Sequence, residues 1–161
     1  MDKGPLTFAS TDISTRAYKL TNSHGQNLHL HGWFGATRPD KIMVVIHGMG
    51  GHGGYYGDSL APYLPPTGIA LYAPDLRGHG LSEGRRGDIE TFNHFQDDVA
   101  TVIRWVRDRH PDLPLFLLGE SMGTPIAITY AAGAPADAQP DFLALVACVV
   151  APTVKPRLDE I

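Results

Sequence analysis

The sequence predicts an α/β fold with a mostly parallel sheet that is preceded by an antiparallel hairpin. Three observations support this fold class. Strand-like and helix-like segments alternate along the chain, most of the strand-like segments are continuous apolar runs, and glycine-rich or polar turns follow them. Continuous β-branched and apolar runs are typical of strands buried on both faces, and their alternation with helices is the pattern of βαβ units.

The predicted strands fall into two groups. The first is a hairpin over about residues 14–34, whose two arms show partial alternation and flank the turn-forming sequence TNSHGQN. The second group consists of buried-type strands within the region 41–152. These strands are predicted at 41–48, 69–75, 113–120 and 142–152. We expect the strands to follow one another across the sheet in chain order.

The segments between these strands have helical patterns. Between residues 91 and 110 the apolar residues fall on one face of a helix, and Pro111 ends it. Residues 55–64 give a weaker helical pattern, because they include a proline. A third helix is expected around Pro125, because proline is tolerated in the first turn of a helix.

Length and composition exclude several classes of protein. A chain of 161 residues suits one domain, and 43% apolar residues, 19% charged residues and a net charge of −4 give no reason to expect nucleic acid as a partner. The single cysteine, Cys148, cannot form an internal disulfide. The first ten residues have no apolar core of signal-peptide length, and no apolar run is long enough to span a membrane. We therefore expect a soluble, cytoplasmic protein, and we identify no metal ligands and no cofactor.

The sequence Gly119-Glu120-Ser121-Met122-Gly123 matches the pattern G-x-S-x-G and lies between a buried-type strand and a helix. This context is typical of a nucleophile elbow, in which a serine occupies a tight and strained turn. Glycines at 119 and 123 remove side chains that would collide with the neighbouring strand and helix. In the alternative interpretation the pattern occurs by chance and the serine only caps the helix.

Two further loops follow predicted buried strands. The glycine-rich sequence that begins at His47 brings a backbone N–H close to a reacting carbonyl, unless it is merely a flexible connection. The sequence from Asp75 to Gly87 is rich in Asp, Arg, Gly and His. A local triad of Asp75, Arg77 and His79 is the less favoured interpretation. We expect instead that Asp–Arg pairing and turn hydrogen bonds in this loop brace the floor of the site.

Together these motifs resemble the α/β-hydrolases, and more narrowly the monoacylglycerol lipase and lysophospholipase branch with its serine aminopeptidase-like members. The resemblance rests on the segments His47–Gly50, Asp75–Gly84 and Gly119–Gly123, whereas Thr124 stands where the family usually has another glycine.

The resemblance implies a serine hydrolase that cleaves a small-molecule carboxylic ester, such as a lipid ester, through an acyl-enzyme on Ser121. Amide or peptide hydrolysis remains open, whereas serine at the elbow excludes reactions that need a carboxylate nucleophile. The resemblance also implies an oxyanion hole formed by the backbone N–H groups of Met49 and Met122. His47 and Gly48 then shape the loop, as Gly119 and Gly123 shape the elbow. The competing class is a non-catalytic, hydrolase-like binding or interaction module.

The resemblance reaches the nucleophile and the oxyanion hole, and no further. In the family the catalytic acid and histidine follow the sixth and eighth strands, beyond an inserted helical cap. Here the sixth predicted strand ends at 152, and we expect residues 153–161 to be the start of that cap or a cut end. Three explanations are open: the N-terminal part of a longer enzyme, a short non-catalytic relative, or a short enzyme that takes its base from His52, His79 or a partner subunit.

We favour the first explanation, in which a C-terminal remainder or a partner subunit covers the last strand. That strand would otherwise leave an apolar edge exposed. We predict that His47, His52 and His79 are not the general base, and that the isolated chain is inactive.

Overall fold

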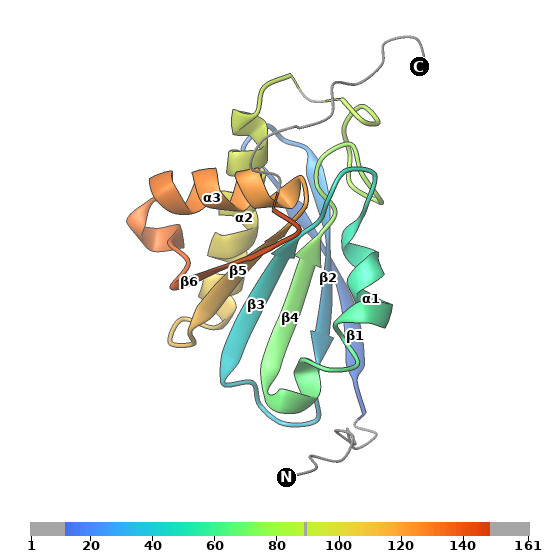
Figure 1. The fold of residues 1–161 in the computed structure, drawn as a ribbon, viewed down its shortest axis with the longest axis vertical. Coiled ribbons are helices and arrows are strands. Elements are labelled where there is room, and N and C mark those ends of the chain that lie inside the picture. The colour runs from blue at the N-terminus through green and yellow to red at the C-terminus, as the bar shows by residue number, and fades with distance from the viewer. Residues whose placement is uncertain (1–11, 89, 149–161) are drawn as a thin grey trace.

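The computed structural model describes residues 12–88 and 90–148, which form one six-stranded sheet with helices on both faces (Figure 1). The strands are β1 (Ser14–Thr21), β2 (Asn27–Phe34), β3 (Lys41–Ile46), β4 (Ile69–Pro74), β5 (Leu115–Glu120) and β6 (Phe142–Val146). β1 pairs antiparallel with β2, and β2 pairs antiparallel with β4, whereas β3, β4, β5 and β6 are mutually parallel. The predicted α/β fold with a leading hairpin is confirmed.

The prediction that the strands follow chain order is wrong. The order across the sheet is β1-β2-β4-β3-β5-β6, so that β4 lies between the hairpin and β3. The reason is the right-handedness of crossovers between parallel strands. Winding in one direction only would place every helix on the same face of the sheet. Because the chain moves from β3 toward the hairpin to form β4 and then back past β3 to form β5, the helices before and after β4 lie on opposite faces.

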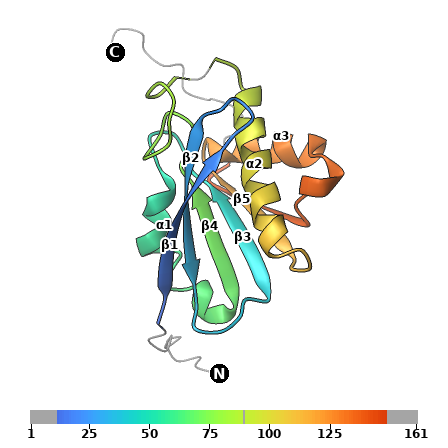
Figure 2. The same ribbon diagram turned by 180° about the vertical axis from the view of Figure 1, so that it is seen from behind.

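The helices are α1 (Tyr56–Ser59), α2 (Asn93–Arg109) and α3 (Gly123–Gly133). Short 3₁₀ turns lie at Gly53–Tyr55, Pro65–Thr67 and Ala136–Ala138. α2 and α3 lie together on one face of the sheet, and α1 lies on the other (Figure 2). The predicted helix over 55–64 is shorter than expected, because Pro62 lacks an N–H and its ring clashes with the preceding turn.

The core has one layer on each side of the sheet. Under α2 and α3, the side chains of Ile103 and Ile126 pack with alternate residues of the central strands, including Leu117. On the opposite face, Tyr56 of α1 packs with Trp33 and the remaining alternate residues. The period-2 alternation of the strands therefore supplies both layers.

β6 is one of the two edge strands of the sheet, and most of its residues are exposed, as are those of β1 at the other edge. The predicted strand over 142–152 extends only to Val146, and Ala147 follows with φ 53°. Positions 149–152 of that prediction lie outside the described residues. Four of the five β6 residues are 40–52% exposed, although they are all apolar.

Candidate active site

Ser121, the predicted nucleophile, lies at the corner between β5 and α3. Its φ is +50°, in the left-handed region that residues with a side chain rarely occupy. Its backbone N–H donates to the Val146 carbonyl at 3.0 Å, and its carbonyl accepts from the Thr124 N–H at 2.9 Å. The corner is therefore strained and is held by the neighbouring strand and the first turn of the helix.

Glycine is required at three positions around this corner. A Cβ on Gly119 would lie 2.5 Å from the Gly123 carbonyl oxygen, and a Cβ on Gly123 would lie 2.1 Å from the Ile46 carbonyl oxygen. These are the collisions with helix and strand that the sequence predicted. A Cβ on Gly48 would lie 3.0 Å from Cβ of Ser121, so the loop after β3 passes directly beside the serine.

The two residues predicted to donate backbone N–H groups flank this contact. Met49 follows Gly48, and its side chain is 81% exposed. Met122 follows Ser121 immediately before α3, and it is partly buried against the core. Both side chains line a pocket of about 560 Å³, together with His52, His79 and Phe95 among others. The serine corner, the glycine-rich loop and this pocket therefore adjoin one another.

His47 is fully engaged in local hydrogen bonds. Its Nδ1–H donates to the Gly48 carbonyl at 2.8 Å, while its Nε2 accepts from the Leu76 N–H at 3.0 Å. Burial lowers the pKa of His47 to about 4, so the ring is neutral at pH 7. Because both ring nitrogens are occupied, the side chain joins the loop after β3 to the loop after β4.

The other two histidines in this region also bind backbone groups. Nδ1 of His52 accepts from the Gly54 N–H at 3.1 Å, and Nδ1 of His79 donates to the Arg77 carbonyl at 2.9 Å. Among the hydrogen bonds of residues 12–88 and 90–148, none joins a histidine to the hydroxyl of Ser121. The absence of a general base from this chain stays a prediction.

Asp–Arg pairing and turn hydrogen bonds brace the loop after β4, as predicted, but the partner of Arg77 lies outside this loop. Arg77 does not pair with Asp75. Its Nε and Nη2 donate to the two carboxylate oxygens of Asp98 in α2, at 2.7 and 2.6 Å, and both side chains are buried. Sequence reasoning missed this partner, because Asp98 lies on a helix 21 residues away. One indication of this partner is present in the sequence: Asp98 is a charged residue at a position of the predicted helix that faces the core, next to Val99.

Asp75 is the centre of a separate hydrogen-bond network. Its carboxylate accepts from the backbone N–H groups of Gly53 and Leu81 at 2.7 Å each, and from Nε2 of His31 at 3.1 Å. Burial raises the pKa of Asp75, but these hydrogen bonds outweigh it and hold the pKa below its usual range. Asp75 thus ties the glycine-rich loop to the loop after β4.

Glu120, next to the serine, accepts a short hydrogen bond from the hydroxyl of Tyr56 in α1. Burial and this contact raise the pKa of the Tyr56 hydroxyl far above its usual range. The bond joins the segment after the glycine-rich loop to the elbow. It was not foreseen, because the two residues are 64 positions apart.

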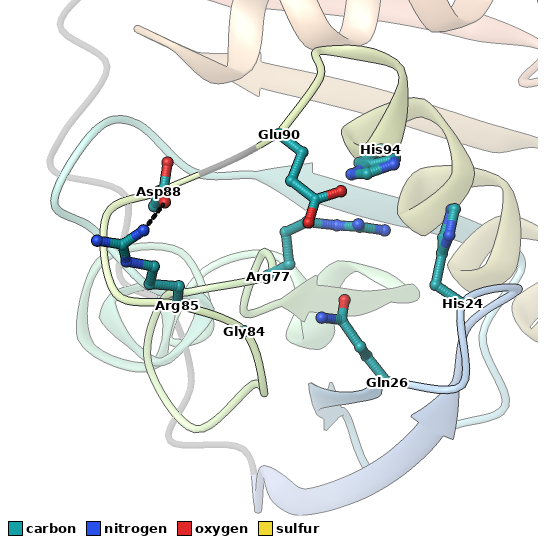
Figure 3. Close-up of a pocket in the computed structure, with 8 residues that line it drawn as sticks. All are labelled: His24, Gln26, Arg77, Gly84, Arg85, Asp88, Glu90 and His94. Atoms are coloured by element: carbon teal, nitrogen blue, oxygen red, sulfur yellow. Dashed lines mark ion pairs between the residues drawn. The ribbon is translucent and has the colours of Figure 1, made fainter.

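A second pocket of about 310 Å³ lies beyond the loop after β4 (Figure 3). Its lining includes Arg77, Arg85 and Glu90, and both arginines are already paired with carboxylates. Arg77 is bound to Asp98, and Arg85 forms an ion pair with Asp88 at 3.1 Å. We therefore take the pocket beside Ser121 as the candidate site.

The fold and the serine corner define an α/β-hydrolase. The family model described as "Serine aminopeptidase, S33" matches residues 37–160, and the chain belongs to this family. The chain is 40% identical to monoglyceride lipase of Mus musculus over 116 residues, which cover 72% of this chain and 38% of the relative. It is 35% identical to monoacylglycerol lipase of Mycolicibacterium smegmatis over 105 residues, covering 65% of this chain and 37% of the relative.

Among solved structures, the chain is similar to a highly thermostable carboxyl esterase from Bacillus coagulans, crystallised in complex with glycerol. The TM-score is 0.71 at 26% identity, over 82% of this chain and 44% of that one. The chain thus spans about two fifths of the length of the curated relatives that it matches. No helix in the described part of the chain is long and apolar enough to cross a membrane.

Proposed function

We propose that this chain carries the nucleophile half of a serine hydrolase that cleaves carboxylic esters through an acyl-enzyme on Ser121. The observation that carries the proposal is the strained backbone of Ser121, held at φ +50° beside Gly48. A non-glycine residue in this conformation costs about 1–3 kcal/mol, which fits a functional corner better than a plain helix cap. The Met49 and Met122 N–H groups would then stabilise the oxyanion.

The proposed substrate is a monoacylglycerol-like or other lipid ester. Relatives whose names specify a monoglyceride or monoacylglycerol lipase support this choice. The lining of the pocket also supports it, because Met49, Met122 and Phe95 offer flexible and aromatic apolar surface to an acyl chain.

The acid and the histidine are proposed to lie on a C-terminal remainder or on a partner subunit. The hydrogen bonds of His47, His52 and His79 to backbone groups support this, because a general base must reach the serine hydroxyl. The competing proposal is a non-catalytic binding module, which the same hydrogen bonds favour equally.

A fluorophosphonate probe tests the nucleophile. We expect rapid labelling of Ser121 when the 161-residue chain is combined with the C-terminal portion, and labelling at least about 10³ slower without it. Ser59→Ala, in exposed α1, is the matched control and should label normally. Absence of labelling in the complete assembly would favour the binding module. If the isolated chain is fully active and loses that activity on His52→Ala or His79→Ala, the proposal that the general base lies outside this chain is wrong.

A substitution pair tests the oxyanion hole. Met49→Pro removes the backbone donor and should lower kcat by about 10²–10³ in the complete assembly. Met49→Leu keeps the N–H and replaces a side chain that is 81% exposed, so we expect little change. Equal damage from both substitutions would show that the side chain, not the N–H, is required.

A further inference from the structure

Two histidines, His31 and His52, lie close to the buried carboxylate of Asp75, and a third, His29, packs against His31. Asp75 is 1% exposed and lies just after β4, where its Oδ1 accepts from His31 of β2. His29, two residues earlier on the same face of β2, places its ring edge-on to that of His31, with centroids 4.4 Å apart. His52 approaches from the glycine-rich loop. The group brings together three segments that are distant in sequence.

The donor atoms of this group are close enough to share one cation. One donor atom from each of His31, His52 and Asp75 lies within 4.8 Å of the others. The His31 Nε2 and Asp75 Oδ1 atoms are 3.1 Å apart. Two ligands at about 2.0–2.2 Å from a tetrahedral Zn²⁺ are separated by roughly 3.3 Å, so this pair already has nearly the required spacing.

We propose that His31, His52 and Asp75 form a binding site for a transition-metal dication, with Zn²⁺ as the best match. Two imidazoles and one carboxylate form a borderline donor set, which suits Zn²⁺, Cu²⁺ or Ni²⁺ better than Mg²⁺ or Ca²⁺. The carboxylate keeps its hydrogen bond from the Gly53 N–H, which orients Oδ1 as an outer partner orients a metal ligand. Water completes the coordination from the side of the pocket that His52 lines.

Metal binding depends on the protonation state of the histidines. Without metal, the proton on Nε2 of His31 lies in the hydrogen bond to Asp75. When Nε2 binds the cation, the neutral ring takes the other tautomer and carries its proton on Nδ1, so the number of protons on the ring is unchanged. Binding needs neutral imidazoles and therefore weakens as the pH falls into the range in which histidines take up a second proton.

The metal would hold the glycine-rich loop against the sheet. His31 and Asp75 lie on or next to the paired strands β2 and β4, whereas His52 belongs to the loop that carries Met49. In the metal-free structure this loop is tied to Asp75 only through the Gly53 N–H. The bound cation adds a direct link from the loop to the two strands.

Titration of the tag-free, chelator-treated 161-residue chain with Zn²⁺ tests the proposal. We expect one saturable site by calorimetry, weaker binding as the pH falls below the usual histidine pKa of about 6.5, and a higher Tm in the presence of Zn²⁺. Co²⁺ as a probe should give the intense visible absorption of a tetrahedral complex. His52→Ala and His31→Gln should each weaken binding at least about tenfold.

His24→Ala is the matched control, because His24 is a half-exposed histidine that pairs with Asp97 away from this group. It should bind Zn²⁺ as the unsubstituted chain does. His52→Ala removes a loop side chain, so its metal-free unfolding midpoint should stay close to that of the unsubstituted chain and show that it is folded. Absence of a saturable site would overturn the proposal, and so would a Zn²⁺ affinity of the His52→Ala and His31→Gln variants equal to that of the unsubstituted chain. Because the readout is metal binding, it is independent of ester hydrolysis.

Discussion

Strands β5 and β6 are parallel neighbours of similar length, yet their burial differs sharply. In β5, Leu115 and Leu117 are completely buried between the sheet and the helices. In β6, Phe142 and Val146 are each about half exposed. Both strands are hydrogen-bonded to a neighbouring strand, so pairing alone does not bury a strand. Burial also requires helices or other segments packed over the faces of the sheet. Ser121 lies at this boundary, with its N–H bonded to the carbonyl of Val146.

The largest expected effect comes from the buried pair between Arg77 and Asp98. Asp98→Asn removes the charge opposite a guanidinium that is 6% exposed, and should cost about 3–5 kcal/mol of unfolding free energy. Asp137→Asn breaks the exposed pair with Arg104 and should cost far less. Urea unfolding of both variants measures the difference. Equal losses of unfolding free energy in the two variants would show that burial does not make the Arg77–Asp98 pair more important than the exposed Arg104–Asp137 pair.

The next effect compares the two strands directly. Leu117→Ala in β5 should destabilise the protein by about 2–5 kcal/mol, because it leaves a cavity in the core. Leu145→Ala in β6 removes a side chain that is 40% exposed and should change stability by roughly 0.5 kcal/mol. A large loss in Leu145→Ala would mean that β6 is covered in solution, for example by a second copy of the chain.

Acid should destabilise the folded chain through the buried ring of His47, which follows β3. Its folded pKa of about 4 is below its unfolded value of about 6.5, so only the unfolded chain gains the proton between these pH values. Stability is therefore full above pH 6.5 and falls by about 3 kcal/mol as the pH drops to 4. His29 and His110, whose pKa values burial also lowers, act in the same direction.

Unfolding free energies measured from pH 7 to 4 test this dependence. His47→Asn should flatten the slope, whereas the slope should persist in His24→Asn, whose ring is partly exposed. An unchanged slope in His47→Asn would contradict the assignment. Asp75, whose pKa is lowered, contributes in a separate window, because its stabilisation is lost only as the pH falls below about 3.9.

The smallest expected change in stability comes from alanine substitutions at two glycines of α3, Gly123 and Gly133, which have different surroundings. Gly123→Ala places a Cβ 2.1 Å from the Ile46 carbonyl oxygen and should cost about 1–3 kcal/mol. Gly133→Ala meets nothing within 4 Å and should be neutral or stabilising by about 0.5–1 kcal/mol. Thermal melts of the two variants measure the shifts. A stable Gly123→Ala protein would show that the corner is not tightly packed.

Local features could be predicted from the sequence because their causes are local. The apolar runs indicated the strands, and the glycines flanking Ser121 indicated a steric requirement that a few neighbouring residues define. The family resemblance followed from three short motifs in order, and the family match confirms it. The roles of Ser121, Met49 and Met122 stay predictions.

Features that depend on distant segments could not be predicted. The position of β4 between β2 and β3 follows from which face the next helix covers, and no single segment encodes that choice. The partner of Arg77 and the partner of Glu120 come from helices on opposite faces of the sheet. The group of His31, His52 and Asp75 was missed for the same reason, because its members are 21 or more residues apart in the sequence.

The reversal at β4 also has a consequence for the order of folding. Strands β1 to β4 complete their mutual pairing within the first 74 residues, whereas β5 must close a loop of about 70 residues to reach β3. Closing long loops is slow, because chain entropy is lost before the contacts compensate for it. We therefore expect the first four strands to pair before β5 joins β3 and the corner at Ser121 forms. During synthesis on the ribosome, we expect one side of β3 to stay unpaired until β5 has been synthesised.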